Sequence, residues 1–362
     1  MELLFDLVFV AFVGQLAHGI HGDPGVREFA TFIVLYFPAW WAWANIVSVV
    51  NLRPNLTARA LGLAMITAMA AAALMAAAAP DAFGERAWAF SLANAGLRGL
   101  LLVLWLGHRR DQATGSAWRI WVYNGGTALL WTVAVFLPIN VAAIVWVVAI
   151  AVEVVMVVLS HRIGADRSLR GIDVEHAGER LGLFVIIVLG ESVFVTVTEA
   201  SANWNPQSGV TATLGFLLVA LLGWGFFQHG ITTLSNALHD LKAKDDLAGL
   251  LRTTLFAPFM PVVGIAAVAA AIATAIPAPN VPLPSGAAIA LGGGLALYYG
   301  TNAAVSLRHG TSRPRVLRWA APSLTISVAA IPLAGAIAAP TALTLVVGAL
   351  FAVAGATDLR RG

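Results

Sequence analysis

The chain of 362 residues is strongly apolar: hydrophobic residues make up 59% of it and charged residues only 11%. Soluble domains carry about 25% charged residues, so this composition excludes an ordinary soluble fold and predicts a membrane protein. The net charge is only +3 and the arginines are spread over many short segments, which argues against nucleic-acid binding. The sequence has no cysteine, which excludes disulfides, a thiolate nucleophile and a cysteine-ligated metal.

Apolar stretches follow one another along the whole chain, and a membrane span needs about 20 such residues. The first stretch begins almost directly at Met1 without a basic region or a cleavage site, so we expect a retained helix and not a signal peptide. The sequence predicts an all-α integral membrane protein with about twelve transmembrane helices. These lie near residues 3–20, 29–51, 58–79, 87–107, 118–137, 139–160, 181–199, 212–234, 252–276, 286–307, 317–336 and 340–357.

Basic residues are concentrated in every second gap between these stretches. Eighteen of the 21 lysines and arginines lie there, whereas the intervening gaps hold only Arg27 and Arg86. Loops rich in lysine and arginine stay in the cytoplasm. We therefore expect a multi-pass protein of the cytoplasmic (inner) membrane, surrounded by lipid, with both termini in the cytoplasm.

The longest cytoplasmic gap divides the predicted helices six and six. We expect a first six-helix bundle at 1–160, a cytoplasmic linker at 161–180 and a second six-helix bundle at 181–362. Polar residues recur in the same order in the two halves, which favours two parallel repeats, as in many transporters. The matching pairs are Gln15 with Glu191 and Asn45 with Gln228.

Two segments carry a resemblance to a known family. The first is Glu-Leu-Leu-Phe-Asp-Leu-Val-Phe-Val at residues 2–10, and the second is His-Ala-Gly-Glu-Arg at 176–180, followed by Val-Ile-Ile-Val-Leu-Gly-Glu-Ser at 185–192. Together they resemble the signatures of the low temperature requirement A (LtrA) family of bacterial membrane proteins. Members usually carry a basic stretch before the first signature and Phe at the position of Leu4, and this sequence differs in both respects. The resemblance implies a polytopic membrane protein linked to growth in the cold or under stress, and it implies no reaction.

Three charged residues lie deep inside predicted spans, well away from their ends: Arg98, Glu153 and Glu191. At about 1.5 Å per residue, Arg98 and Glu191 reach similar depths near mid-membrane. Glu153 lies nearer the cytoplasm, within reach of the long arginine side chain. A buried charge without a partner is costly, so we predict a direct or one-water contact from Arg98 to one of the two acids. The pair is either a staple that holds helices in register or part of a substrate or proton site.

The signature residues form a second group of candidates. Glu2 and Asp6 are four residues apart and share a helix face, whereas Gln15 lies on the opposite face, so Asp6 and Gln15 line one pathway only if the helix breaks near Gly14. At the start of the seventh span, the spacing of the signature residues predicts one face that caps the helix or forms a cytoplasmic gate. The residues of this cytoplasmic motif are Glu2, His176, Glu179, Arg180 and Gly190.

Enzymatic chemistry lacks support in the sequence. His18 and His21 have no carboxylate at metal-ligand spacing beside them, and no P-loop or Gly-x-Ser-x-Gly motif occurs. We expect neither an enzyme nor a cofactor or metal site. Pro258 and Pro261 make the ninth span the best place for a broken helix, which in transporters often marks the binding region.

These observations favour a secondary transporter of a small solute, with proton coupling as one form of it. Glu191 would be the titrating or substrate-facing acid, Arg98 its counter-charge and Glu153 an alternative partner. Gln15, Asn45 and Gln228 would supply polar lining. The alternative is an ion channel or a membrane stress factor that transports nothing and uses the same charges as a fixed network. The sequence leaves the solute and the oligomeric state unassigned.

Overall fold

The computed structural model describes residues 1–53, 56–112, 117–163 and 167–358, and all regular structure in these ranges is helical. The predicted all-α fold is thus confirmed. Within the described ranges, nine helices are long and apolar enough to cross a membrane. The larger number of twelve spans and the six-plus-six repeat stay predictions.

The chain divides into two compact units, each made of segments that are distant in sequence. The first unit comprises 1–16, 33–181 and 238–256, and the second comprises 17–32, 182–237 and 257–362. Helices α1, α2, α9 and α11 therefore contribute residues to both units. The expected division into six-helix bundles at 1–160 and 181–362, joined by the linker at 161–180, stays a prediction.

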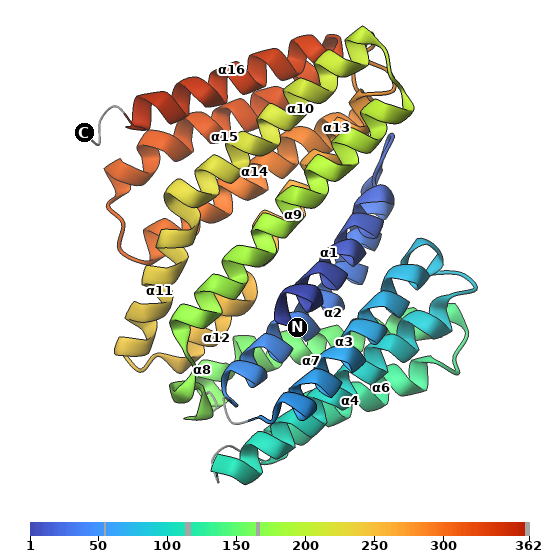
Figure 1. Cartoon of the computed structure of the whole chain (residues 1–362), viewed down its shortest axis with the longest axis vertical. Coiled ribbons are helices and arrows are strands. Elements are labelled where there is room, and N and C mark those ends of the chain that lie inside the picture. Colours follow the sequence, from blue (N-terminus) through green and yellow to red (C-terminus); the bar gives the residue numbers. More distant parts are fainter. Residues whose placement is uncertain (54–55, 113–116, 164–166, 359–362) are drawn as a thin grey trace. The chain divides into compact units, whose positions relative to one another are not determined.

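The first unit packs helices side by side through apolar and small residues. Helix α4 contacts α3 and α6, and α6 also contacts α7 (Figure 1). Its elements are α1 (Glu2–His18), α2 (Val26–Asn51), α3 (Ala58–Ala78), η1 (Ala79–Asp81), α4 (Ala87–Gln112), α5 (Ala117–Ile120), η2 (Trp121–Gly126), α6 (Thr127–Ala134), α7 (Ile139–Val158), α8 (Ser160–Ile163), η3 (Arg167–Gly171) and α12 (Leu247–Phe256), with the start of α9 (Val174–Ala202) and the end of α11 (Ile231–Ala243).

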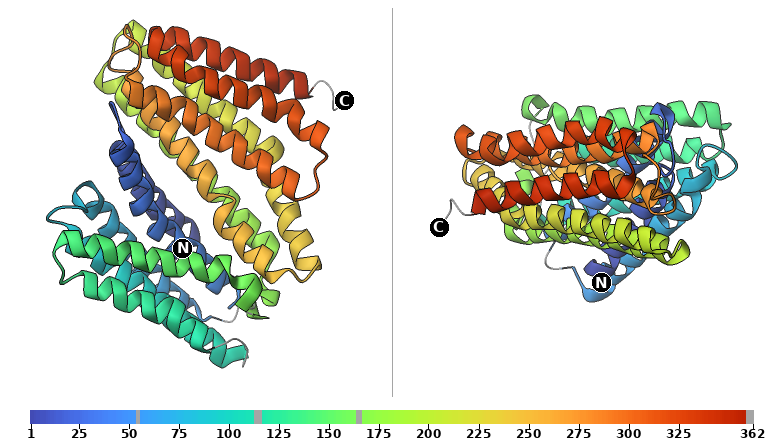
Figure 2. Two further views of the ribbon diagram at one scale, coloured as in Figure 1. Left: turned by 180° about the vertical axis from the view of Figure 1, so that it is seen from behind. Right: turned by 90° about the horizontal axis from the view of Figure 1, so that it is seen from above.

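The second unit is built around α13, nearly all of whose residues are buried. Five of its helices form a closed ring of neighbours, α10–α13–α14–α15–α16 and back to α10, and α13 to α16 run from orange to red in Figure 2. The elements are α10 (Pro206–Gly225), η4 (Phe226–Gly230), α13 (Phe259–Ala275), α14 (Ser285–Arg308), α15 (Arg313–Ala336) and α16 (Ala339–Asp358), together with most of α9 and the start of α11.

Glycines allow the closest helix contacts in this ring. A Cβ atom on Gly264 of α13 would lie 2.5 Å from the carbonyl oxygen of Gly294, and a Cβ on Gly292 of α14 would lie 2.5 Å from the carbonyl oxygen of Ser327 in α15. In membrane proteins, small residues at helix interfaces allow the backbones of neighbouring helices to approach this closely. Gly293 lies between Gly292 and Gly294 in the sequence, but a Cβ atom there would have its nearest neighbour 4.0 Å away.

Helix interruptions agree with only part of the expectation. The expected break at the ninth span is present, because α12 ends at Phe256 and α13 begins at Phe259, after Pro258. Helix α1 runs unbroken through Gly14. Two π-helical turns, η2 and η4, have no counterpart in the sequence-based expectations. Single π turns inside α-helices often mark functional sites.

Candidate functional site

The first unit contains a buried ion pair between α4 and α7. The Nε and Nη2 atoms of Arg98 lie 3.0 and 3.1 Å from the two carboxylate oxygens of Glu153, and both side chains are almost fully buried. The Nη1 atom donates to the carbonyl oxygen of Pro38 at 2.9 Å and to Oδ1 of Asn94 at 3.0 Å. The predicted contact from Arg98 to an acid is thus confirmed, and the acid is Glu153.

Every nitrogen of the Arg98 guanidinium has a partner, and the ring of Trp131 lies 5.7 Å from its central carbon. Bidentate pairing of this kind offsets the cost of burying two charges only when the remaining donors are also satisfied. Because Arg98 meets this condition, the geometry favours a staple that joins α2, α4 and α7. The guanidinium therefore has little remaining hydrogen-bonding capacity with which to bind a solute.

Glu191 has a different environment. It lies on α9 in the second unit, is half-buried and has no hydrogen-bond partner among the described residues. Its expected role as a titrating or substrate-facing acid stays a prediction. Gly190 beside it is exposed, and a Cβ there would meet no atom within 4 Å, so the glycine meets no packing requirement.

The two signature segments meet in the first unit, although their residues are more than 170 positions apart. Arg180 pairs with the carboxylate of Glu2 through Nη1, and its Nη2 donates to Oδ1 of Asp6 at 2.6 Å. Nε1 of Trp43 donates to the same Asp6 oxygen at 2.7 Å, and Nε2 of His176 lies 3.3 Å from Glu2 Oε2. Two pairs at i and i+4, one on α1 and one on α9, thus form one cluster of acidic and basic side chains.

This cluster connects the start of α9 to the start of α1, as expected of a helix-end anchor. Asp6 is fully buried and Arg180 nearly so, and Asp6 depends on Arg180 as its charge partner, whereas Arg180 also pairs with the more exposed Glu2. Glu179 does not take part: it is exposed and makes no ion pair with a described residue. Gln15 is exposed too, and the break in α1 on which a shared pathway with Asp6 depended is missing.

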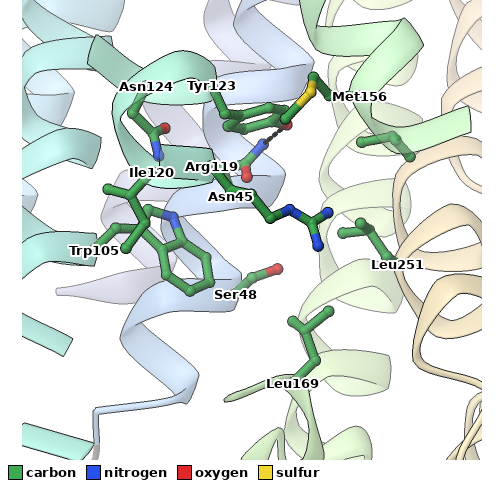
Figure 3. Close-up of a pocket in the computed structure, with 11 residues that line it drawn as sticks. Asn45, Ser48, Trp105, Arg119, Ile120, Tyr123, Asn124, Met156, Leu169 and Leu251 are labelled. Carbon is green, nitrogen blue, oxygen red and sulfur yellow. Dashed lines mark hydrogen bonds between the residues drawn. The ribbon is translucent and has the colours of Figure 1, made fainter. Parts of the chain in front are cut away.

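A partly open cavity of about 80 Å³ lies in the first unit beside Asn45 (Figure 3). The Nδ2 atom of Asn45 donates to the carbonyl oxygen of Trp41 at 2.7 Å and to the hydroxyl oxygen of Tyr123 at 3.2 Å. Tyr123 belongs to the π turn η2, which brings both it and Asn124 to the cavity. The lining residues are Asn45, Ser48, Trp105, Arg119, Ile120, Tyr123, Asn124, Met156, Val157, Leu169 and Leu251.

The charge of this lining is one-sided. Arg119 is its cation, and no acidic residue is present among the described residues that line the cavity. In Figure 3 the Arg119 guanidinium extends past Asn45 toward the space above Leu169 and beside Leu251.

The ion pair and the cavity occupy successive levels of the same helices. Asn45 follows Pro38 by seven residues on α2, and Trp105 follows Arg98 by seven residues on α4, which places the cavity about 10 Å from the pair along each axis. On α7 the lining residue Val157 follows Glu153 by one turn. The cavity therefore lies on the side of the pair that the distribution of basic residues assigns to the cytoplasm.

Gln228 occupies a comparable position in the second unit. It belongs to the π turn η4 and lines a smaller cavity, of about 40 Å³, together with Trp224, Tyr299 and Ser323. Asn45 and Gln228, one of the two pairs matched between the halves, thus each lie beside a cavity and a π turn. Arg119 and Tyr123 were not among the sequence-based candidates, because the former served only to orient the chain and the latter follows no recognised motif.

Comparison with known proteins identifies the family. The family described as "Bacterial low temperature requirement A protein (LtrA)" matches residues 1–355, so the chain belongs to this family. "Uncharacterized protein RA0937" of Rhizobium meliloti (strain 1021) is 27% identical over 271 residues, which cover 73% of this chain and 65% of that relative. The chain thus matches less than two thirds of the relative's length. No solved structure matches.

Proposed function

We propose that this member of the LtrA family is a secondary transporter of a small solute, and that the cavity beside Asn45 and Tyr123 is its solute-binding site. The observation that carries the proposal is the lining itself, in which a cation, two amides and two hydroxyls project from otherwise apolar helices. Polar and charged groups at membrane depth are costly and usually mark a pathway. The adjoining π turn adds support, since irregular backbone at such depth is tolerated where it lines a cavity.

The stacked levels support an inward-facing site. The cavity lies on the side of the Arg98–Glu153 pair assigned to the cytoplasm, and the buried pair, with Trp131 against it, lies between the cavity and the opposite ends of α2, α4 and α7. We place the chain in the inner membrane with both termini in the cytoplasm. Asn280→Cys should then react with an impermeant thiol reagent from outside and Lys244→Cys from the cytoplasm. The wild-type chain has no cysteine, so each label has a single source.

Proton coupling would require an acid that changes its protonation state during transport. Glu191 stays our candidate because it is half-buried and lacks a hydrogen-bond partner in the described part of the chain. Glu191→Gln should insert and fold but lose proton-linked flux, because an amide keeps the shape of the side chain and cannot release a proton. Full proton-linked flux in this variant would remove Glu191 from the mechanism.

The second candidate is a membrane stress factor that transports nothing. The Arg98 guanidinium favours this alternative, because each of its nitrogens already has a hydrogen-bond partner within the protein, and a fixed ion pair needs no solute. The family description refers to a low-temperature requirement, and we extend that link to this chain as part of the proposal. Poor growth of a deletion strain in the cold is expected under both candidates, so growth alone does not separate them.

Flux into proteoliposomes separates the candidates while the solute is still unidentified. Vesicles holding the purified chain are challenged with isosmotic small solutes, including urea, glycerol, ammonium propionate and potassium chloride, and swelling is followed by light scattering. Saturable entry of one class is expected. Large unitary currents would indicate a channel, and permeability equal to that of empty vesicles for every solute would favour the structural alternative.

A matched pair of variants assigns the flux to the cavity. Ser48 lines the cavity and its hydroxyl donates to the carbonyl four residues earlier at 2.7 Å. Thr67 makes the same type of bond at 2.8 Å but is exposed on α3. Ser48→Leu should fill the cavity and abolish flux, whereas Thr67→Leu should leave it unchanged.

A further inference from the structure

We infer that the connection between α14 and α15 binds an anionic phospholipid, and binds one with two phosphate groups, such as cardiolipin, most tightly. Arg308 is the last residue of α14, Arg313 is the first of α15, and Arg315 and Arg318 follow within two turns. All four side chains are exposed, and none forms a hydrogen bond or an ion pair with a described residue. This arginine patch belongs to the second unit, so the inference does not depend on the transport proposed above.

Membrane topology alone does not account for the charge of the patch. The gap at 160–180 also carries four arginines, but it carries four acidic residues as well. Its Arg170 pairs with Asp245 at 2.5 Å. The patch at 308–318 contains no acidic residue, and none occurs at any position from 247 to 357. The patch therefore presents a positive surface that attracts anions.

The arginines lie at the level of the lipid headgroups. Helix α15 is apolar enough to cross a membrane, and its 24 residues span about 36 Å, whereas the hydrocarbon core is about 30 Å thick. The first turn of α15 therefore extends beyond the hydrocarbon. Arg318 lies about 8 Å from the start of the helix, so its long side chain reaches the headgroups. A cluster of four basic residues at the end of a membrane helix is typical of sites for anionic lipids.

Apolar neighbours distinguish a phospholipid from a soluble anion. Leu307 precedes Arg308, Leu317 precedes Arg318, and both leucines are exposed. From Leu317, exposed residues continue along α15 at every third or fourth position to Val328. A soluble phosphate would leave these side chains in water, whereas the acyl chains of a phospholipid would cover them.

The arrangement of the arginines favours a lipid with two phosphates. Arg315 and Arg318 are three residues apart and share a face of α15. Arg308 and Arg313 flank a connection of four residues, in which Gly310 adopts a φ of +87°, and α14 and α15 pack side by side (Figure 1). The planar fork of arginine binds phosphate oxygens through two parallel hydrogen bonds. Two pairs of arginines thus match the two phosphates of cardiolipin better than the single phosphate of phosphatidylglycerol.

The experiment titrates lipids onto the purified full chain in an uncharged detergent and measures their affinities by native mass spectrometry. Cardiolipin, phosphatidylglycerol and phosphatidylcholine with the same acyl chains are compared. Each arginine near the membrane surface strengthens binding to anionic lipid about fivefold, so cardiolipin should bind at least tenfold more tightly than phosphatidylcholine, with phosphatidylglycerol between them. A higher concentration of ammonium acetate should weaken the binding of cardiolipin and leave that of phosphatidylcholine unchanged. Pyrophosphate and polyglutamate should displace cardiolipin only weakly.

Paired substitutions assign the binding to the arginine patch. Arg315→Gln combined with Arg318→Gln should weaken cardiolipin about tenfold or more and leave phosphatidylcholine unchanged. Arg27→Gln combined with Arg59→Gln is the matched control, because it removes the same charge from two exposed arginines outside the patch and should have little effect. All four side chains are exposed, so both double variants should fold, and circular dichroism verifies this.

A second pair of variants tests the apolar part of the site. Leu317→Ser should weaken cardiolipin several-fold and leave the weak competition by pyrophosphate unchanged, because only the lipid contacts the leucine. Leu345→Ser is its control, since Leu345 is equally an exposed leucine but lies near the start of α16, which follows the opposite end of α15.

Several results would overturn the inference. They include equal affinities for cardiolipin and phosphatidylcholine, and unchanged cardiolipin binding in the Arg315→Gln, Arg318→Gln variant. Equal losses in that variant and in its control would show a general effect of charge. Displacement of cardiolipin by low concentrations of pyrophosphate would assign the patch to a soluble anion, and displacement by polyglutamate would assign it to an acidic protein partner.

Discussion

Removal of one partner of the Arg98–Glu153 pair should destabilise the first unit strongly, whereas removal of both should not. Glu153→Gln leaves the guanidinium, 1% exposed, without its bidentate partner. Breaking a buried pair in this way costs about 3–5 kcal/mol. With about 2–4 °C per kcal/mol for a unit of this size, the expected fall in Tm is about 6–20 °C. Arg98→Gln strands the carboxylate and should fall within the same range.

The double variant distinguishes a staple from a set of independent contacts. Arg98→Gln combined with Glu153→Gln leaves two amides that hydrogen-bond without charge, so the double variant should recover much of the loss, with a coupling energy of about 1.5–3 kcal/mol. The assay is thermal unfolding in nanodiscs. The exposed acid Glu175 provides the control, because Glu175→Gln should stay within about 0.5 kcal/mol of the wild type. Wild-type stability in Glu153→Gln, or strictly additive losses in the double variant, would refute the reasoning.

Three further predictions concern the rest of the chain. Gly294→Ala brings a Cβ within 2.6 Å of a backbone oxygen and should cost about 1–3 kcal/mol, whereas Gly293→Ala, 4.0 Å from its nearest neighbour, should be near neutral in thermal unfolding. Burial and a neighbouring histidine lower the pKa of His21, outside the spans, from 6.5 to about 4. Because the unfolded chain binds the proton more readily, stability should be complete above pH 6.5 and should decline as the pH falls toward 4; a slope no flatter in His21→Gln would contradict this. Arg180→Gln should lower Tm by stranding the buried charge of Asp6, and Asp6→Asn in the same chain should restore much of the loss; no recovery would exclude the pairing.

The sequence predicts the level of a buried charge better than it predicts its partner. Arg98 and the two acids stand out because charges are rare in apolar stretches, and the helix rise fixes their depths. The choice of Glu153 as the partner of Arg98 depends on α7 packing beside α6, which carries Trp131, and within reach of Arg98 on α4, and no local pattern encodes that neighbourhood.

The signature cluster and the cavity illustrate the same limit. The i, i+4 spacing of Glu2 with Asp6 predicts a shared face on α1, and that of His176 with Arg180 a shared face on α9, but only tertiary packing brings the two faces together. The π turn that carries Tyr123 contains no proline by which the sequence would indicate an irregular helix, and its backbone conformation depends on tertiary packing. The break after Phe256 was predictable, because proline removes a backbone donor.

The most direct test of the transport proposal is a single cysteine in the cavity. Ser48→Cys lines the cavity, whereas Ser91→Cys is buried on α4 seven residues before Arg98, on the other side of the ion pair. A small hydrophilic thiol reagent applied to the cytoplasmic face should modify Ser48→Cys rapidly and abolish solute flux. It should leave both Ser91→Cys and the cysteine-free wild type active. Complete modification of Ser48→Cys with unchanged flux would contradict the claim that solute passes through this cavity.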